Sequence, residues 1–145
     1  MNRYEWLKNT DCFKPSALKH IFEGDLKGMI AVGYHYEGLP NTGGSLVPGT
    51  ETVPNSYGVY EAQVRINGVL KLANGGFSSF FPRFMSPQEV VDSINEAYNV
   101  RDFVQGNMYE GTSSSGMKIY IYLDVEDKII SAFPVYWKVR GKTIF

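Results

Sequence analysis

The sequence predicts an α+β domain in which a helical N-terminal segment is followed by antiparallel β-hairpins and sheets with one inserted helix. Three observations favour this class. Residues 60–66 and 118–124 alternate between polar and apolar side chains, as half-buried strands do. Each of these runs is followed by a turn and a second strand-like run. Between the two hairpins, residues 86–99 carry apolar side chains at helical spacing behind a capping sequence.

The size of the chain fits one domain. It has 145 residues, 43% of them hydrophobic, which is enough for a real hydrophobic core. We assign residues 1–15 to a lead-in segment and residues 16–145 to a single domain. Ser16 is the candidate N-cap of a short helix that includes His20, and Gly24 ends that helix.

Residues 38–56 are rich in glycine, proline, serine and threonine, and this composition predicts one long surface loop. Loops of this length are uncommon unless they bind something or are disordered. This loop is therefore a candidate binding surface.

The first hairpin follows this loop. Its strand over residues 60–66 leads into Asn67-Gly68, the strongest short signal for a tight hairpin turn. Residues 69–72 form the return strand. Because successive side chains of a strand point to opposite faces, Lys71 lies on the other face from the two leucines beside it.

The clearest helix begins at Ser86. Serine is a good N-cap, Pro87 fits the first turn, and Glu89 completes a capping box. An apolar stripe at helical spacing then predicts the buried side of the helix, which ends near Asn99. The stripe consists of Val90, Val91, Ile94, Ala97 and Tyr98.

The last hairpin pairs residues 118–124 with residues 129–134 through a turn at Glu126-Asp127. Ser131 and Phe133 are two residues apart and therefore share a face. The same parity puts Tyr120 and Tyr122 on one face, a pair that we interpret as sheet packing rather than as a base-stacking platform.

Composition excludes several classes of function. The net charge of −1 and the pI of about 6.1 argue against a strong nonspecific nucleic-acid binder, which is usually basic. Cys12 is the single cysteine, so no internal disulfide forms, and no metal-ligand spacing indicates a metal site. No apolar run approaches the roughly 20 residues that span a bilayer. Without a signal peptide, the chain is either cytosolic or a piece of a larger exported protein.

The two histidines of the chain, His20 and His35, are the strongest chemical signal. Histidine exchanges protons near neutral pH because its ordinary pKa is about 6.5. With Lys71 they would supply a base, an acid and a cation, which is what cleavage of RNA through its own 2′-hydroxyl requires. DNA lacks that hydroxyl, so we expect no DNA substrate. The alternative is that each histidine is an ordinary hydrogen-bonded side chain.

Four segments, in this order, resemble the bacterial EndoU endoribonucleases. They are Lys19–Gly24 with Gly33–Glu37, Phe80–Pro82 leading into the capping box, Lys118–Asp124, and Lys128–Pro134. Together the resemblance spans residues 16–136. It implies an enzyme without a cofactor or metal that leaves 2′,3′-cyclic phosphate and 5′-hydroxyl ends.

The resemblance also implies roles for individual residues. His20 and His35 match the paired catalytic histidines, and Lys71 matches the catalytic lysine. Ser131 and Phe133 match substrate-binding positions near the base pocket, although eukaryotic and coronavirus relatives carry tyrosine at the position of Phe133. Of the two histidines, we expect His35 to act as the base and His20 as the acid.

In bacteria such domains commonly form the C-terminus of exported toxins, with contact-dependent growth inhibition effectors as the best-known carriers. The resemblance therefore implies export within a larger effector, action on RNA, often tRNA, in the cytoplasm of the target cell, and a cognate immunity protein. Lys138, Arg140 and Lys142 form a basic cluster that either contacts phosphates or is a solvated tail. The alternative function is a non-catalytic module that binds RNA or protein on the same fold.

Overall fold

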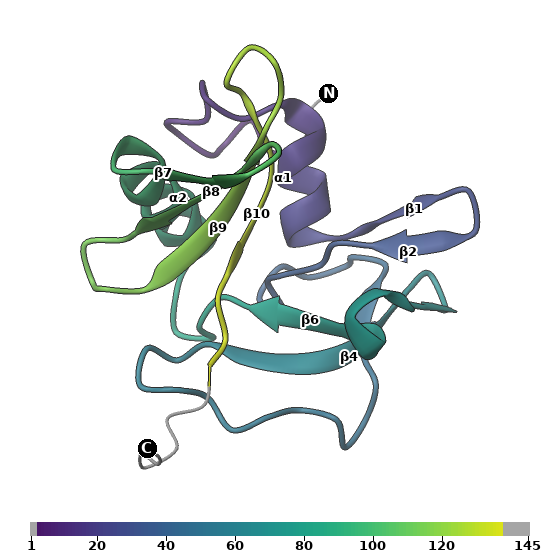
Figure 1. Cartoon of the computed structure of the whole chain (residues 1–145). Helices are drawn as coiled ribbons and strands as arrows, with labels where there is room; N and C mark the ends of the chain where they lie inside the picture. Colours follow the sequence, from purple (N-terminus) through teal and green to yellow (C-terminus); the bar gives the residue numbers. More distant parts are fainter. Residues whose placement is uncertain (1–2, 138–145) are drawn as a thin grey trace.

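The computed structural model describes residues 3–137 and confirms the α+β class. Two α-helices and several antiparallel sheets make up this part of the chain (Figure 1). The elements in order are α1 Pro15–Phe22, β1 Asp25–Lys27, β2 Ile30–Val32, β3 Gly44–Leu46, β4 Tyr60–Ile66, β5 Val69–Leu70, the 3₁₀ turn η1 Ala73–Gly76, β6 Phe77–Phe80, α2 Pro87–Asn99, β7 Asp102–Gln105, β8 Met108–Thr112, β9 Lys118–Leu123 and β10 Ile129–Pro134.

The strands form a larger and a smaller unit, with the β1–β2 hairpin beside them (Figure 1). The larger unit is a four-stranded sheet in the order β10-β9-β8-β7. In the smaller unit β4 pairs with β3 and β5 along one part of its length and with β6 along another. All of these pairs are antiparallel.

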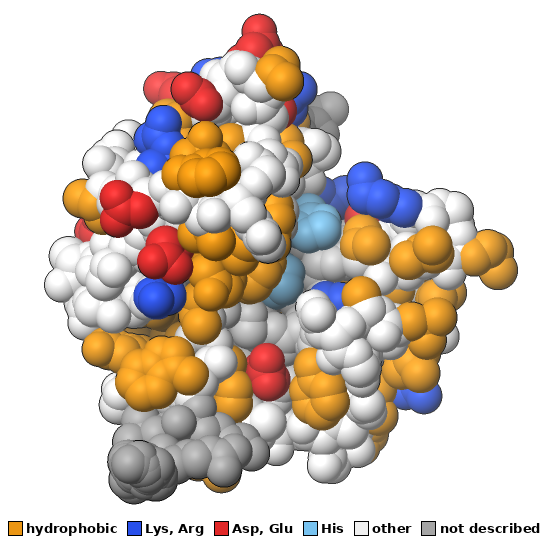
Figure 2. Space-filling view, in the orientation of Figure 1, with side chains coloured by type: hydrophobic (Ala, Val, Ile, Leu, Met, Phe, Trp, Pro, Cys, Tyr) orange, Lys and Arg blue, Asp and Glu red, His pale blue; other side chains and the backbone are white. Residues whose placement is uncertain are grey.

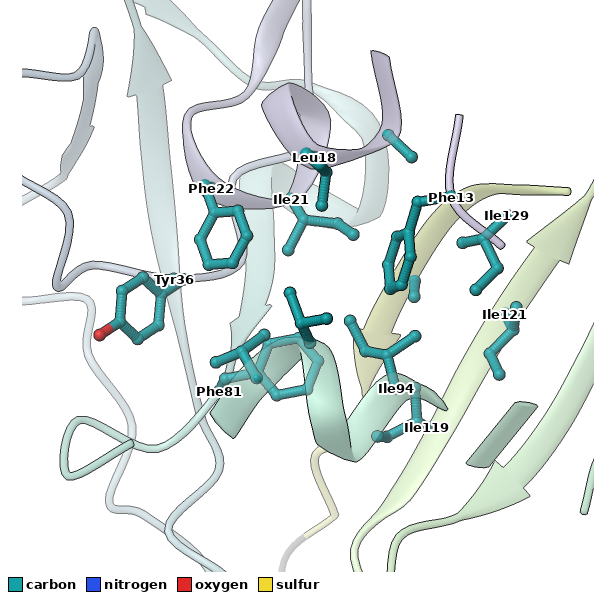
Figure 3. Close-up of a cluster of buried hydrophobic side chains, with 14 of the residues drawn as sticks. Phe13, Leu18, Ile21, Phe22, Tyr36, Phe81, Ile94, Ile119, Ile121 and Ile129 are labelled. Carbon is teal, nitrogen blue, oxygen red and sulfur yellow. The ribbon is translucent and has the colours of Figure 1, made fainter. Parts of the chain in front are cut away.

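The main core lies between the two helices and one face of the large sheet. Ile119, Ile121 and Leu123 alternate along β9 and are buried against the helices, as the period of a strand requires (Figure 3). Helix α2 begins with the predicted capping box: Ser86 Oγ accepts from the Glu89 amide at 3.1 Å, and the Ser86 amide donates to the Glu89 carboxylate at 2.8 Å. This cap contributes about 1 kcal/mol to the stability of the helix.

A second, smaller core fills the space around β4 and β6. Its aromatic centre is Phe80, which stacks on Tyr60 at 5.2 Å and meets Tyr34 edge to face at the same distance. Ala62, Val64 and Ile66 complete it from β4. The chain therefore has two hydrophobic cores, and a functional site can form where they meet.

The N-terminal segment differs from the expectation of a simple lead-in. Tyr4, Leu7 and Phe13 are buried within the main core. Helix α1 begins at Pro15, with Lys14 at the N-cap and no side-chain cap, so the prediction that Ser16 caps this helix is wrong. Proline at the first helical position, with its fixed φ, starts the helix instead.

The predicted loop over residues 38–56 contains the short strand β3, which pairs with β4. Further along, the Val47 amide donates to the Gln63 carbonyl at 2.7 Å and the Thr52 amide to the Glu61 carbonyl at 2.8 Å. These bonds hold the segment on the small sheet. Among the described helices, none has the length and hydrophobicity that crossing a bilayer requires.

Candidate active site

A cavity of about 270 Å³ opens where the two cores meet. Its walls come from α1, β2 and the segment after it, β4, the segment from Lys71 into η1, β6 and β10. The residues that carry chemistry in it are His20, His35, Glu61, Lys71, Ser78, Ser79 and Phe133. Figure 2 shows the two histidines side by side in a hollow, bordered by apolar side chains over β9 and β10.

His35 is held at three points. Its amide donates to the Ile21 carbonyl at 2.7 Å, and its carbonyl accepts from the Phe81 amide at 2.8 Å. Its ring Nδ1 lies 2.8 Å from the Ser79 carbonyl oxygen. Because a carbonyl can only accept, Nδ1 carries the hydrogen, and the neutral ring keeps a free lone pair on Nε2. His35 is thus oriented as a proton acceptor.

His20 lies in the last turn of α1, and its ring centre is 5.9 Å from that of His35. The chain after β2 runs close to it, because the Tyr34 amide donates to the His20 carbonyl at 2.8 Å. Gly33 makes this approach possible. A Cβ atom there would lie 2.4 Å from the His20 carbonyl oxygen and 3.0 Å from its ring, and the φ of +80° also favours glycine.

Lys71 is buried, with 6% of its surface exposed, and its two leucine neighbours are exposed. The parity predicted from the sequence is therefore correct, but it is the lysine that faces inward. Its Nζ donates to Ser78 Oγ at 2.9 Å, and Ser78 Oγ donates to the Gly33 carbonyl at 2.9 Å. Ser78 thus ties the cation to the turn between the two histidines.

The charge of this cavity favours neutral imidazoles. Burial lowers the pKa of His20 to about 4, and the positive charges of Lys71 and Lys27 act in the same direction, against a smaller opposing effect of Asp25. Burial, with Lys71 and His20, also holds the pKa of His35 well below its ordinary value. Burial lowers the pKa of Lys71 as well. Both histidines are therefore unprotonated at neutral pH.

Phe133 forms the wall of the cavity on the side of the large sheet. Its ring stacks on that of His35, with centres 5.1 Å apart and planes 23° from parallel. Ser131 lies two residues away on the same strand, opposite Tyr122, and is not among the described residues that line the cavity. The structure thus brings four of the five predicted site residues to one cavity and leaves Ser131 beside it.

Sequence reasoning did not identify Ser78 or Ser79. A serine pair in an aromatic strand carries no chemical signature, and only the fold shows that Ser78 Oγ contacts Lys71 and that the Ser79 carbonyl contacts His35. Within residues 3–137, no group of three or more histidine, cysteine or acidic side chains could hold a metal ion. The basic cluster predicted from Lys138 onward lies outside the described residues.

The arrangement has a definite chemical capacity. A lone pair, a second imidazole and an ammonium group border the same small cavity, and an aromatic ring covers one wall. Such a set can move one proton off and another onto a substrate while it stabilises an anion.

Comparisons with known proteins agree with this capacity. A family model described as bacterial EndoU nuclease matches residues 15–136. A protein of Bacillus cereus named "Toxin" is 50% identical over 129 residues, which cover 88% of this chain and 24% of that protein. The chain thus spans about a quarter of the length of this relative. No solved structure matches the chain.

Proposed function

Because the chain belongs to the bacterial EndoU nuclease family and is an endoribonuclease, we propose that it cleaves RNA through the substrate's own 2′-hydroxyl without a metal ion. His20, His35 and Lys71 are the catalytic residues of this proposal. The observation that carries it is the meeting of these three side chains, from three separate segments, at one cavity.

The proposed proton transfers use both histidines, and the hydrogen bond of His35 to Ser79 supports its role. His35 Nε2 takes the proton of the 2′-hydroxyl, and the freed oxygen attacks the adjacent phosphorus. His20 gives a proton to the departing 5′-oxygen as the P–O bond breaks. Lys71 neutralises the charge that develops on the phosphorane oxygens. The products are a 2′,3′-cyclic phosphate and a 5′-hydroxyl.

The roles differ because the two histidines differ in access. The Nδ1 hydrogen bond to the Ser79 carbonyl leaves His35 ready to accept a proton. His20 is only partly buried, so it can take a proton from solvent before the reaction. A bound phosphate would favour that protonation, since a nearby negative charge raises the pKa of an imidazole.

Phe133 and Ser131 are proposed to contact the base of the cleaved nucleotide. The part-exposed Phe133 ring offers a stacking surface next to His35, and any base can stack on it. Phenylalanine has no hydroxyl, so this wall selects bases by shape and stacking rather than by a hydrogen bond.

We further propose that the chain is the toxin domain of a larger exported effector, of the contact-dependent growth inhibition type. It would act on RNA, with tRNA as the expected target, in the cytoplasm of the target cell, and a cognate immunity protein would neutralise it. Two findings support this proposal: the name of the Bacillus cereus relative and the quarter of that protein which the chain spans.

Purified variants test the proposed chemistry. His20→Ala and His35→Ala should each lower the rate of RNA cleavage by about 10²-fold or more, with the fold intact by circular dichroism. Lys71→Ala should lower the rate of RNA cleavage by a similar factor. Lys19→Ala is the matched control, because Lys19 is an exposed lysine of α1 paired with Asp25, and it should leave the rate nearly unchanged.

The same assay distinguishes other functions. EDTA should not slow the wild-type protein, and sequencing of RNA ends should detect cyclic phosphates. Near-normal cleavage by both histidine variants would refute the mechanism. Intact RNA with every substrate would favour a non-catalytic binding module instead.

A further inference from the structure

Three aromatic side chains continue from the cavity onto the large sheet. Strand register pairs Phe133 of β10 with Tyr120 of β9, and Ser131 with Tyr122, so all four side chains share one face. The Phe133 ring centre lies 5.9 Å from that of Tyr120 and 6.0 Å from that of Tyr122. We call Phe133, Tyr120 and Tyr122 the aromatic patch.

Neither helix covers this face. Helix α2 packs against the opposite face, where Ile119 and Ile121 are buried. Figure 2 shows apolar side chains that border the histidines over β9 and β10 and are open to solvent. Tyr120 and Tyr122 are only partly buried, so part of each side chain is open to a ligand.

The hydroxyl groups of these two tyrosines also have no hydrogen-bond partner among the described residues. Neither makes a hydrogen bond with any residue in the described part of the chain, whereas Tyr36, Tyr98 and Tyr136 each donate to a backbone carbonyl. Tyrosines that stabilise a fold usually find such a partner. The pair on β9 is therefore free to contact a ligand with both ring and hydroxyl.

The acidic residue beside Tyr120 on the neighbouring strand is paired with a lysine. Glu110 of β8 lies opposite Tyr120 in the strand register, and its carboxylate lies 3.7 Å from the Lys118 ammonium group. Because exposed ion pairs are weak, Lys118 can turn toward a phosphate at little cost. The face thus combines flat aromatic rings with an exposed cation, as surfaces for single-stranded nucleic acid do.

We propose that the aromatic patch binds the bases of RNA nucleotides next to the cleaved one, an inference that rests on the proposed function. The aromatic patch is continuous with the cavity, because Phe133 stacks on His35 and contacts both tyrosines. An RNA strand that leaves the cavity therefore meets Tyr122 and Tyr120 next. A protein interface of ordinary size needs roughly 20 or more residues on each side, far more than three rings. Single-stranded RNA fits this small, flat surface better.

The test compares a short and a longer substrate. The cut site is first mapped in cellular RNA, and kcat/KM is then measured for a dinucleotide spanning that site and for a hexanucleotide centred on it. Wild-type protein should cleave the hexanucleotide about tenfold or more faster, because each stacked base strengthens binding about fivefold or more and the two tyrosines offer two further rings. Tyr120→Leu/Tyr122→Leu should lose this gain and keep the dinucleotide rate.

Two variants serve as controls. Tyr120→Phe/Tyr122→Phe keeps both rings and should retain most of the gain. Phe103→Leu removes an exposed ring from the opposite face of the same sheet and should change neither rate. The dinucleotide rate reports a folded active site, and the single leucine variants replace the double variant if it does not fold.

The outcomes separate this inference from the proposed function. Equal rates for the two substrates with wild-type protein, or an unchanged gain in the leucine variants, would overturn the aromatic patch alone. Loss of the gain in the phenylalanine variants would overturn stacking as its cause. If wild-type protein cuts no cellular RNA, so that no site can be mapped, the proposed function itself fails.

Discussion

Ser78→Ala removes one oxygen atom that serves two buried partners. Ser78 has 2% of its surface exposed, accepts from Lys71 Nζ at 2.9 Å and donates to the Gly33 carbonyl at 2.9 Å. Without it, a buried ammonium and a buried carbonyl both lose a partner. Each unsatisfied group costs about 1–3 kcal/mol, so the free energy of unfolding should fall by about 2–6 kcal/mol.

The neighbouring serine provides a matched control. Ser79 is 9% exposed and lines the same cavity, but its buried hydroxyl has no partner in the described part of the chain. Removing an unsatisfied hydroxyl relieves a desolvation penalty, so Ser79→Ala should be neutral or slightly stabilising. Its backbone carbonyl, which accepts from His35, stays in place.

Urea unfolding followed by tryptophan fluorescence measures both variants, and an RNA cleavage assay measures their activity. Ser78→Ala should also cleave RNA about tenfold or more slowly, because Lys71 is no longer held toward the histidines. A double-mutant cycle with Lys71→Met should give a coupling energy of about 1–3 kcal/mol. Equal losses of stability in the two serine variants, or no coupling to Lys71, would refute this account of the site.

The two buried histidines and Gly33 each give a testable prediction. Between about pH 6.5 and about 4, the unfolded state binds more protons than the folded state, because burial lowers the pKa of His20 to about 4 and that of His35 well below its ordinary value. Urea unfolding should therefore show a stability that decreases as the pH decreases in this window, by up to about 1.4 kcal/mol per pH unit for each histidine, and His20→Gln/His35→Gln should remove this contribution. For the same reason kcat/KM should rise as pH falls from about 8, with its maximum below about 6.5. Gly33→Ala should lower the melting temperature and the cleavage rate, since its Cβ would lie 2.4 Å from the His20 carbonyl oxygen. Gly28→Ala, with a φ of +63° and nothing within 4 Å, should show only the smaller cost of a left-handed residue, about 1–2 kcal/mol.

Opposite results would contradict these two predictions separately. A stability that does not change between about pH 6.5 and about 4 would mean that the histidines are solvated rather than buried. Equal losses in the two alanine variants would mean that Gly33 is needed for its backbone conformation and not for its closeness to His20.

The elements that could be predicted from the sequence are those specified by local rules. The capping box at Ser86 fixed the start of α2, and strict alternation fixed the faces of β4 and β9. Alternation also separated Lys71 from Leu70 and Leu72 correctly. It could not show which face is inside, and the structure leaves the leucines 41% and 75% exposed and buries the lysine.

The parts that could not be predicted depend on contacts between distant segments. Tyr4, Leu7 and Phe13 look like scattered apolar residues in the sequence, and only the packed helices show that they fill the main core. Ser78 acquires a role only when β6 meets Lys71 and Gly33, seven and 45 residues away in sequence. No local pattern encodes either arrangement.

The segment that carries His35 shows why the two cores are needed together. Tyr34 has a φ of +76°, a left-handed conformation that costs a bulky residue about 1–2 kcal/mol. Two contacts hold it there: its amide donates to the His20 carbonyl, and its ring is buried in the small core against Phe80. Two residues later Tyr36 is buried in the main core. His35 lies between these anchors and turns toward the cavity, so the packing of both cores stabilises a strained backbone that orients the proposed base.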